Sequence, residues 1–312
     1  MEGKLQVFSG SANPALASEI AEILGIPLGR AFVGAFKDEE TRVRIEDNVR
    51  GSDVFIVQPT CRPVDHHIME LLIMIEAVRR ASARRITAVI PYFGYSRQEK
   101  KSVGREPITG KLVANLITVA GASRVLTLDL HTPAIEGFFD IPVDHLRSAN
   151  VLVAHCKQMK LEDVVVVSPD PGGVLRANDF RARLGASLAI IAKQRPAADV
   201  AEIIEMVGEV RDKNAVIVDD IISTGGTLIE AANMLMERGA KAVYAFGVHA
   251  PLAGRAANLI AESNIRRVVI TNSIPVTEAQ KGDKIEVLTI APLIAEAIKR
   301  IHEDVSVSAL FR

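Results

Sequence analysis

Two adjacent carboxylates followed by small hydroxyl residues and glycines form the clearest chemical signal in the chain. They lie in the segment VIVDDIISTGGT at 216–227, where Asp219 and Asp220 end an apolar run. Glycines let the backbone turn tightly and point successive N–H groups at one anion, and Ser and Thr hydroxyls add donors. Carboxylates beside such a loop can accept hydrogen bonds from sugar hydroxyls or hold a metal ion. The segment therefore predicts a site for a phosphorylated sugar, although its loop would also suit an ordinary helix entry around Thr227.

Four further polar clusters follow short apolar runs, and each contains residue types that suit phosphate or metal chemistry. They are PYFGYSRQEKK at 91–101, DLH at 129–131, SPDPGG at 168–173 and KQR at 193–195. Arg and Lys side chains neutralise phosphate oxygens, whereas carboxylates and imidazoles bind metal ions. Each cluster also has a structural alternative, which is a solvated charged loop, a structural histidine or an Asp-Pro turn.

The elements expected around these clusters belong to an α/β fold. Short β-rich apolar runs predict eight strands, at 54–58, 86–90, 125–128, 164–167, 188–192, 215–218, 242–247 and 267–271. Segments with helical periodicity lie between many of them, at 67–80, 108–120, 175–184 and 227–238. Strands that are apolar on both faces and alternate with helices indicate a mainly parallel sheet covered by helices. The polar clusters then stand at the carboxyl ends of strands, where parallel sheets bind ligands, which favours an enzyme.

Length and composition limit the classes of protein to which the chain can belong. The 312 residues predict two domains, and turn-prone residues near 139–150 place them at 1–146 and 147–312. A net charge of −1 gives no electrostatic reason to expect nucleic-acid or anionic-membrane partners. No apolar run is long enough to span a membrane, and the first residues lack the features of a secretory signal. A cytoplasmic protein is therefore expected.

The cysteines and one pair of histidines are expected to have no chemical role. Cys61 and Cys156 are far apart and in no CxxC arrangement, so neither a disulfide framework nor a cysteine zinc site is indicated, and both thiols are expected to be inert. His66 and His67 are neighbours that would point in different directions on a helix, and we expect both at the surface.

Several long segments resemble those of the ribose-phosphate pyrophosphokinases, also called phosphoribosyl pyrophosphate synthetases. They include GSANPALASEIAEILG, HIMELLIMIEAVRRASARRITAVIPYFGYSRQ, REPITGKLVANLI, DLHTPAIEGFFDIPVDHL, VVVVSPDPGGVLRA, DDIISTGGT and AEAIKRIHEDVSVSALF. The resemblance covers nearly the whole chain. It implies Mg²⁺-dependent transfer of the β,γ-diphosphoryl group of ATP to the 1-hydroxyl of ribose 5-phosphate, giving phosphoribosyl diphosphate and AMP. It also implies two tandem phosphoribosyltransferase-like domains and a homo-oligomer, usually a hexamer.

The same resemblance implies roles for individual residues. The family's nucleotide-binding segment and ATP contacts match Phe36, Asp38, Glu39, Glu40, Arg97 and Gln98. Its metal-binding positions match His131 and Asp170, and its flexible catalytic loop matches Lys193 and Arg195. Its ribose 5-phosphate site matches Arg195, Asp219, Asp220, Ser223, Thr224, Gly225, Gly226 and Thr227. A regulatory phosphate or ADP site would correspond to Asn48, Arg50, Ser82, Arg84, Ser306 and Ser308.

Three positions depart from the family pattern. Glu39 replaces the glycine of F-S-D-G-E, Glu99 replaces the aspartate of R-Q-D, and Ser223 replaces the third acid of D-D-x-x-D-T-x-G-T. Two other functions therefore stay open. One is a phosphoribosyltransferase, which would share DDIISTGGT but has no need of the nucleotide segments in the first half. The other is a catalytically silent, synthetase-like regulatory subunit.

Overall fold

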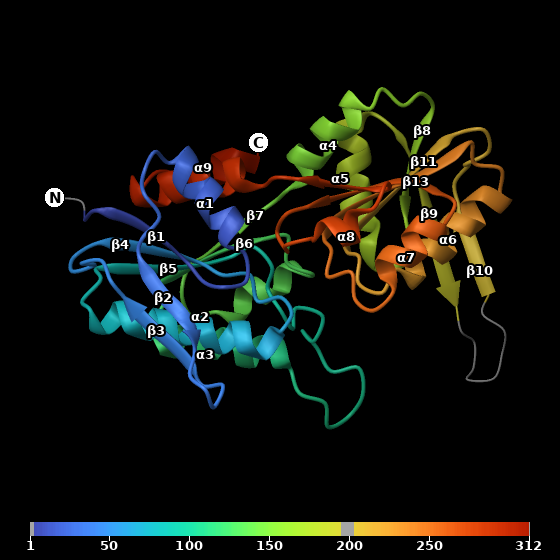
Figure 1. The fold of residues 1–312 in the computed structure, drawn as a ribbon. Helices are drawn as coiled ribbons and strands as arrows, with labels where there is room; N and C mark the ends of the chain where they lie inside the picture. Colours follow the sequence, from blue (N-terminus) through green and yellow to red (C-terminus); the bar gives the residue numbers. More distant parts are fainter. Residues whose placement is uncertain (1–2, 195–202, 312) are drawn as a thin grey trace. The chain divides into compact units, whose positions relative to one another are not determined.

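The computed structural model describes residues 3–194 and 203–311, and the chain forms two compact units. Unit 1 comprises Met1–Arg147, Ser273–Pro275 and Thr289–Arg312, and unit 2 comprises Ser148–Asn272 and Val276–Leu288. Each unit contains its own sheet, flanked by helices (Figure 1).

Unit 1 is built on a parallel five-stranded sheet in the order β1-β4-β5-β6-β7. Its strands are β1 (Leu5–Ser9), β4 (Asp53–Val57), β5 (Arg85–Ile90), β6 (Arg124–Leu128) and β7 (Val143–Leu146). Helices α1 (Pro14–Ile23) and α9 (Ala291–His302) lie on one face of this sheet, and α2 (Val64–Arg80) and α3 (Thr109–Ala120) lie on the other (Figure 1). A separate antiparallel hairpin pairs β2 (Ala31–Ala35) with β3 (Thr41–Ile45), and two short 3-10 helices are η1 (Pro133–Phe138) and η3 (Val307–Phe311).

Unit 2 is built on a seven-stranded sheet in the order β10-β9-β8-β11-β12-β13-β14. Its strands are β8 (Val164–Ser168), β9 (Ser187–Gln194), β10 (Ile203–Val207), β11 (Asn214–Ile221), β12 (Ala242–His249), β13 (Ile265–Thr271) and β14 (Ile285–Leu288). All neighbouring pairs are parallel except β9 and β10, which are antiparallel. Its helices are α4 (Ala149–Gln158), α5 (Val174–Leu184), α6 (Gly226–Glu237), α7 (Ala256–Glu262) and the short α8 (Glu278–Lys281), with η2 (Pro171–Gly173) before α5.

The apolar strands are buried on both faces, as the sequence predicts. All five residues of β4 are buried. On β12, Ala245 packs in the cluster that contains α6 and α7, whereas Phe246 lies 5.5 Å from the ring of Phe180 on α5. Successive side chains of a strand point to opposite faces, so helices must cover both sides of this sheet. The eight predicted strands and four predicted helices are all present, with ends that shift by a few residues, and the α/β class is confirmed.

The C-terminal segment returns to unit 1, which the expected division at residues 146 and 147 did not include. Residues 289–312 belong to unit 1, where α9 packs against α1. The helix buries Ile294, Ile298 and Ile301 along one stripe. This stripe needs an apolar partner, and the first helix of the chain supplies it.

None of the helices in the described part of the chain has the length and apolar character that a membrane span needs.

One histidine and both cysteines are buried. His67 is only 7% exposed and its Nδ1 lies 2.8 Å from the carbonyl of Cys61, so the expectation of a surface position was wrong for this residue. His66 is half exposed and lies 3.6 Å from the carboxylate of Glu70. Burial raises the pKa values of the Cys61 and Cys156 thiols to about 11, as expected for inert thiols.

Candidate active site

The adjacent acids of unit 2 end β11 beside an arginine. Nη1 of Arg176, on α5, lies 3.6 Å from Oδ1 of Asp219 and 3.3 Å from Oδ1 of Asp220. Burial, followed by the charge of Asp220, raises the pKa of Asp219 to about 7, and the opposing effect of Arg176 does not offset this. Both carboxylates lie near the same guanidinium, and a metal ion or a ligand rich in hydroxyl groups would be a further favourable partner for them. Arg176 was not predicted, although its place in the first turn of the helix after SPDPGG is visible in the sequence.

The loop after these acids leads directly into the amino end of α6. Gly225 has a φ of +82°, a left-handed conformation that favours glycine, and the helix begins at Gly226. No side-chain hydrogen bond to a described residue caps this helix. The N–H of Ala253 donates to the carbonyl of Ser223 over 3.0 Å and holds the loop from behind. Helix amino ends present unpaired N–H groups and a positive dipole, so this turn suits a phosphate group.

Asp170 makes a structural hydrogen bond and also lies near the adjacent acids Asp219 and Asp220. Its Oδ1 accepts a hydrogen bond from the N–H of Gly173 over 2.9 Å, and it caps η2. Its charge also contributes to raising the pKa of Asp219, which places the two carboxylates near each other. The structure thus brings Asp170, Asp219 and Asp220 together in unit 2.

In unit 1, Asp129 and His131 follow β6, as expected. The N–H of Asp129 donates to the carbonyl of Leu146 over 3.0 Å and extends the pairing of β6 with β7. The N–H of Leu130 then donates to Nε2 of His145 over 2.8 Å. His145, on β7, was not predicted, because it is separated from the loop by 15 residues and only strand pairing brings it there.

Arg97 and Gln98 are both exposed in the loop between β5 and α3. Oε1 of Gln98 accepts a hydrogen bond from the hydroxyl of Thr109 over 2.5 Å, and the N–H of Gly110 donates to its carbonyl over 3.2 Å. The beginning of α3 therefore fixes Gln98. Arg97 directly precedes Gln98, so its backbone is held close to the beginning of α3.

The predicted nucleotide segment forms the tip of the β2–β3 hairpin. The N–H of Phe36 donates to the carbonyl of Glu40 over 2.8 Å, and Glu39 has a φ of +71°. The position at which Glu39 replaces a family glycine is thus one where the backbone adopts the conformation that favours glycine. The guanidinium carbon of Arg42 lies 5.2 Å from the ring centroids of both Phe36 and Phe32, and it was not predicted. Asp38 is exposed in the same turn.

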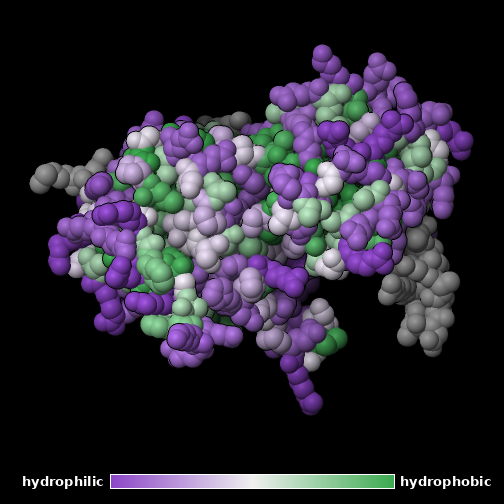
Figure 2. Space-filling model, in the orientation of Figure 1, coloured by the Kyte–Doolittle hydropathy of each residue, from purple (hydrophilic) through white to green (hydrophobic). Residues whose placement is uncertain are grey.

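Apolar surface is visible over this hairpin. Phe32 and Phe36 are 43% and 50% exposed, and Figure 2 shows green apolar surface here with purple hydrophilic residues around it. An exposed phenylalanine held by a guanidinium offers a flat face on which an aromatic base can stack.

The two residues expected in the catalytic loop lie at the edge of what the structure describes. Lys193 is in β9, and its backbone pairs with that of Ile204 in β10. Arg195 lies outside the described residues.

Comparisons with known proteins agree over the full length of the chain. The N-terminal domain model of ribose phosphate pyrophosphokinase matches residues 5–121, and the phosphoribosyl synthetase-associated domain model matches residues 193–312. A ribose-phosphate pyrophosphokinase from Caldanaerobacter subterraneus subsp. tengcongensis is 54% identical over 308 residues, 98% of either chain. One from Bacillus caldolyticus is also 54% identical over 308 residues, 99% of this chain and 98% of that protein. The chain belongs to the ribose-phosphate pyrophosphokinase family.

A solved structure of the family supports the fold. The crystal structure of phosphoribosylpyrophosphate synthetase from Mycobacterium smegmatis has 41% sequence identity and a TM-score of 0.92, over 96% of this chain and 99% of that one. The predicted family and the predicted fold of two phosphoribosyltransferase-like domains are therefore confirmed.

The residues that a pyrophosphokinase regulatory site would use all lie in unit 1. They are Asn48, Arg50, Ser82, Arg84, Ser306 and Ser308. The first four stand close together in the fold, because the N–H of Gly51 donates to the carbonyl of Ser82 over 2.9 Å. The hydroxyls of Ser306 and Ser308 lie 2.8 Å apart, just after α9.

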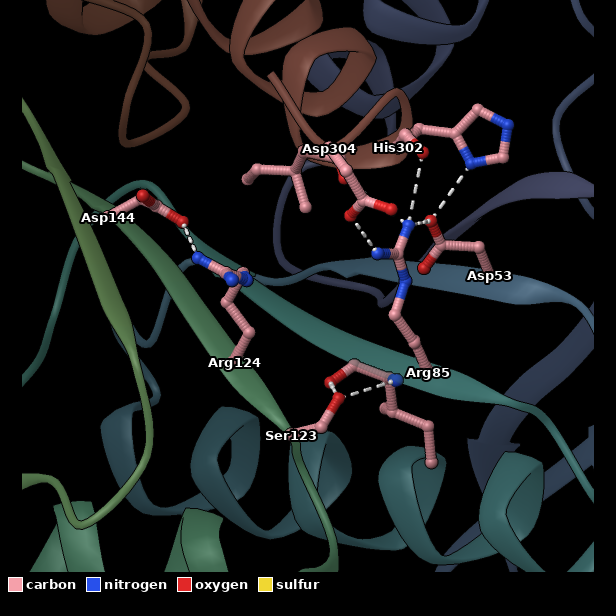
Figure 3. A network of polar contacts seen from close by, with 9 residues as sticks. Asp53, Arg85, Ser123, Arg124, Asp144, His302 and Asp304 are labelled. Carbon is pink, nitrogen blue, oxygen red and sulfur yellow. Dashed lines mark hydrogen bonds and ion pairs between the residues drawn. The ribbon is translucent and has the colours of Figure 1, made fainter. Parts of the chain in front are cut away.

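A network centred on Arg85 fastens the end of α9 to the sheet beside these segments (Figure 3). Its guanidinium donates to the carboxylates of Asp53 and Asp304, each over 2.5 Å, and to the carbonyls of Ile301 and His302, each over 3.2 Å. Nδ1 of His302 lies 2.9 Å from the same oxygen of Asp53. The bond to Asp53 raises the pKa of Arg85, so this cation is permanent.

Proposed function

We propose that the chain transfers the diphosphoryl group of ATP to the 1-hydroxyl of ribose 5-phosphate, giving 5-phosphoribosyl 1-diphosphate and AMP. Membership of the family supports the reaction. The observation in this molecule that carries the proposal is the turn after β11, where two carboxylates precede a glycine-rich entry to a helix. Such a turn provides hydrogen-bond acceptors for sugar hydroxyls and N–H donors for a phosphate within one loop.

Ribose 5-phosphate is assigned to unit 2. Its phosphate would bind the N–H groups and hydroxyls of residues 223–227, and its hydroxyls would donate to Asp219 and Asp220. Ser223 supports this arrangement, since its hydroxyl can donate to the sugar phosphate where the family pattern has a third acid. The left-handed φ of Gly225 supports it too, because this conformation turns the backbone so that α6 begins at the phosphate.

ATP is assigned to residues of unit 1. Arg97 would pair with phosphate oxygens, and Gln98, which the start of α3 holds in place, would contact the nucleotide. The exposed ring of Phe36, together with the acidic residues Asp38, Glu39 and Glu40, would contact the base and the ribose. Diphosphoryl transfer requires mainly positioning and charge neutralisation, so these contacts serve catalysis by orienting the substrate.

The carboxylates of unit 2 suit Mg²⁺ as single ligands, whereas no group of three or more candidate metal ligands lies together among the described residues. Mg²⁺ prefers oxygen ligands and is usually bound by one or two carboxylates together with substrate phosphates. Burial, and then the negative charges of Asp220 and Asp170, raise the pKa of Asp219, and a divalent cation would offset the effect of these charges. Asp170 and His131, each within its own unit, are each proposed as a Mg²⁺ ligand. When bound, the ion neutralises charge on phosphate oxygens.

Lys193 and Arg195 are the proposed catalytic cations. Negative charge spreads over the phosphoryl oxygens in the transition state, and fixed cations stabilise it more than the ground state. Lys193 lies near the carboxyl end of β9, a strand that pairs in parallel with β8. Ligands bind at this edge of a parallel sheet, which supports the role.

Regulation, assembly and location extend the proposal. Phosphate or ADP would bind the regulatory residues of unit 1, and Asn48 would supply amide donors where a serine is common in the family. The assembled enzyme is proposed to be a cytoplasmic homohexamer, and light scattering after size exclusion measures the oligomer. Activity that is indifferent to both phosphate and ADP would contradict the regulatory site.

One assay tests the reaction and separates the alternatives. The purified chain is incubated with Mg²⁺, ATP and ribose 5-phosphate, and AMP and phosphoribosyl diphosphate are measured. Formation of both products in equal amounts is expected. Consumption of phosphoribosyl diphosphate with a nucleobase would indicate a phosphoribosyltransferase instead, and no turnover by a folded protein would indicate a silent subunit.

A further inference from the structure

The loop between β6 and η1 begins at Asp129, and a hydrogen bond to the backbone of Leu130 holds it in place. Asp129 has a φ of +37°, which turns the chain out of the strand. Leu130 is only 4% exposed, so its backbone N–H needs a partner within the protein. That partner is Nε2 of His145, at 2.8 Å. The imidazole thus replaces a strand carbonyl and fixes the backbone immediately before His131.

The hydrogen bonds determine how His145 is protonated. A backbone N–H can only donate, so Nε2 must accept and the ring proton must lie on Nδ1. Nδ1 is 2.5 Å from Oε1 of Glu136, which receives that proton in a hydrogen bond. The imidazole side chain is 4% exposed, and burial lowers its pKa, so the neutral ring is favoured. Glu136 orients His145, and His145 in turn holds Leu130.

We propose that His145, oriented by Glu136, is a positioning residue that sets the loop of residues 129–131 so that His131 meets the metal ion bound with ATP. The proposal rests on the metal-binding role given to His131 under the proposed function. Residues that orient a metal ligand typically affect metal affinity by about 10- to 100-fold when they are changed. A purely structural histidine would affect folding without this specific loss.

Mn²⁺ serves as the probe, and its binding to the full chain in the presence of ATP is followed by electron paramagnetic resonance. His145→Leu removes the acceptor for Leu130, and it is expected to weaken Mn²⁺ binding about 10-fold. It should also raise the KM for metal-bound ATP more than the KM for ribose 5-phosphate. His145→Gln places Oε1 where Nε2 stood, so most of the affinity should return.

A matched control comes from the neighbouring residue of the same strand. Asp144 bonds to Nη1 of Arg124 at 2.5 Å, and Asp144→Asn is expected to leave Mn²⁺ affinity unchanged. Melting temperatures of all variants separate loss of folding from loss of metal binding. If His145→Leu does not fold, Glu136→Ala carries the test, because it removes the partner of Nδ1 and leaves the imidazole in place.

The outcomes distinguish this inference from the function on which it rests. Wild-type Mn²⁺ affinity in folded His145→Leu, or in folded Glu136→Ala where that variant carries the test, overturns the positioning role if His131→Ala weakens binding. Wild-type affinity in His131→Ala removes the metal-binding role itself, whether or not the protein synthesises phosphoribosyl diphosphate.

Discussion

Replacing Arg85 by Met should destabilise unit 1 through one buried carboxylate. The side chain of Asp53 is 3% exposed and bonds to Arg85, whose own side chain is 35% exposed. Without the guanidinium, the described partner that remains for Asp53 is Nδ1 of His302, at 2.9 Å. The other carboxylate oxygen, Oδ1, is already buried with no hydrogen bond to a described residue. The methionine would therefore leave a largely uncompensated charge inside the protein.

The cost follows from the burial of the two partners. Removing one partner of a buried ion pair costs about 3–5 kcal/mol, and we take the lower end because water reaches Arg85 and can solvate part of the site. For a unit of this size, each kcal/mol lowers the melting temperature by about 2–4 °C, so we expect a fall on the order of 10 °C. Differential scanning calorimetry at neutral pH measures this change.

Asp304→Ala provides the comparison for Arg85→Met. Asp304 also bonds to Arg85, but its side chain is 71% exposed, so water replaces that bond and little change is expected. A fall of the same size in both variants, or a fall below about 2 °C in Arg85→Met, would refute the reasoning from buried charge. Since the network holds the end of α9, which precedes Ser306 and Ser308, Arg85→Met should also weaken the response of activity to phosphate and ADP.

Four other substitutions test the site. Lys193→Ala should lower turnover about 100- to 1,000-fold at an unchanged melting temperature, and more than a tenth of wild-type turnover would contradict its role. Gly225→Ala places a side chain at a φ of +82°, which costs about 1–2 kcal/mol, and should raise the KM for ribose 5-phosphate more than that for ATP. Because the pKa of Asp219 is raised to about 7, its contribution to folding is most favourable at acid pH and is lost as the pH rises through 7. Asp219→Asn stays neutral, so without metal or substrate it should raise the melting temperature more at pH 8 than at pH 5, and an equal effect at both would show that the pKa is not raised. Glu39→Gly removes the strain of a φ of +71° and should stabilise the hairpin by up to about 1 kcal/mol. Backbone hydrogen exchange of residues 31–45 should therefore slow. Faster exchange would mean that Glu39 makes stabilising contacts.

Local sequence was sufficient to predict most of the buried strands and the acidic residues that follow β11. Strands such as β4 are buried on both faces, so their apolar runs stand out without knowledge of their neighbours. Asp219, Asp220 and the loop before α6 follow such a strand directly, and the carboxyl edge of a parallel sheet is a predictable place for a ligand. The β2–β3 hairpin was not predicted as strands, because none of its residues is fully buried and neither strand forms a continuous apolar run, although β3 (TRVRI) does alternate.

The supporting contacts depended on the tertiary structure. Arg176 reaches the acids from another element, His145 meets Leu130 across two paired strands, and Arg85 bonds to Asp304 over a separation of 219 residues. The sequence determined which chemical groups the chain carries and which strand ends present them, since both follow from neighbouring residues. Only the tertiary structure decided which distant partners hold those groups in place and shift their pKa values, because burial and hydrogen bonding depend on what the fold brings near.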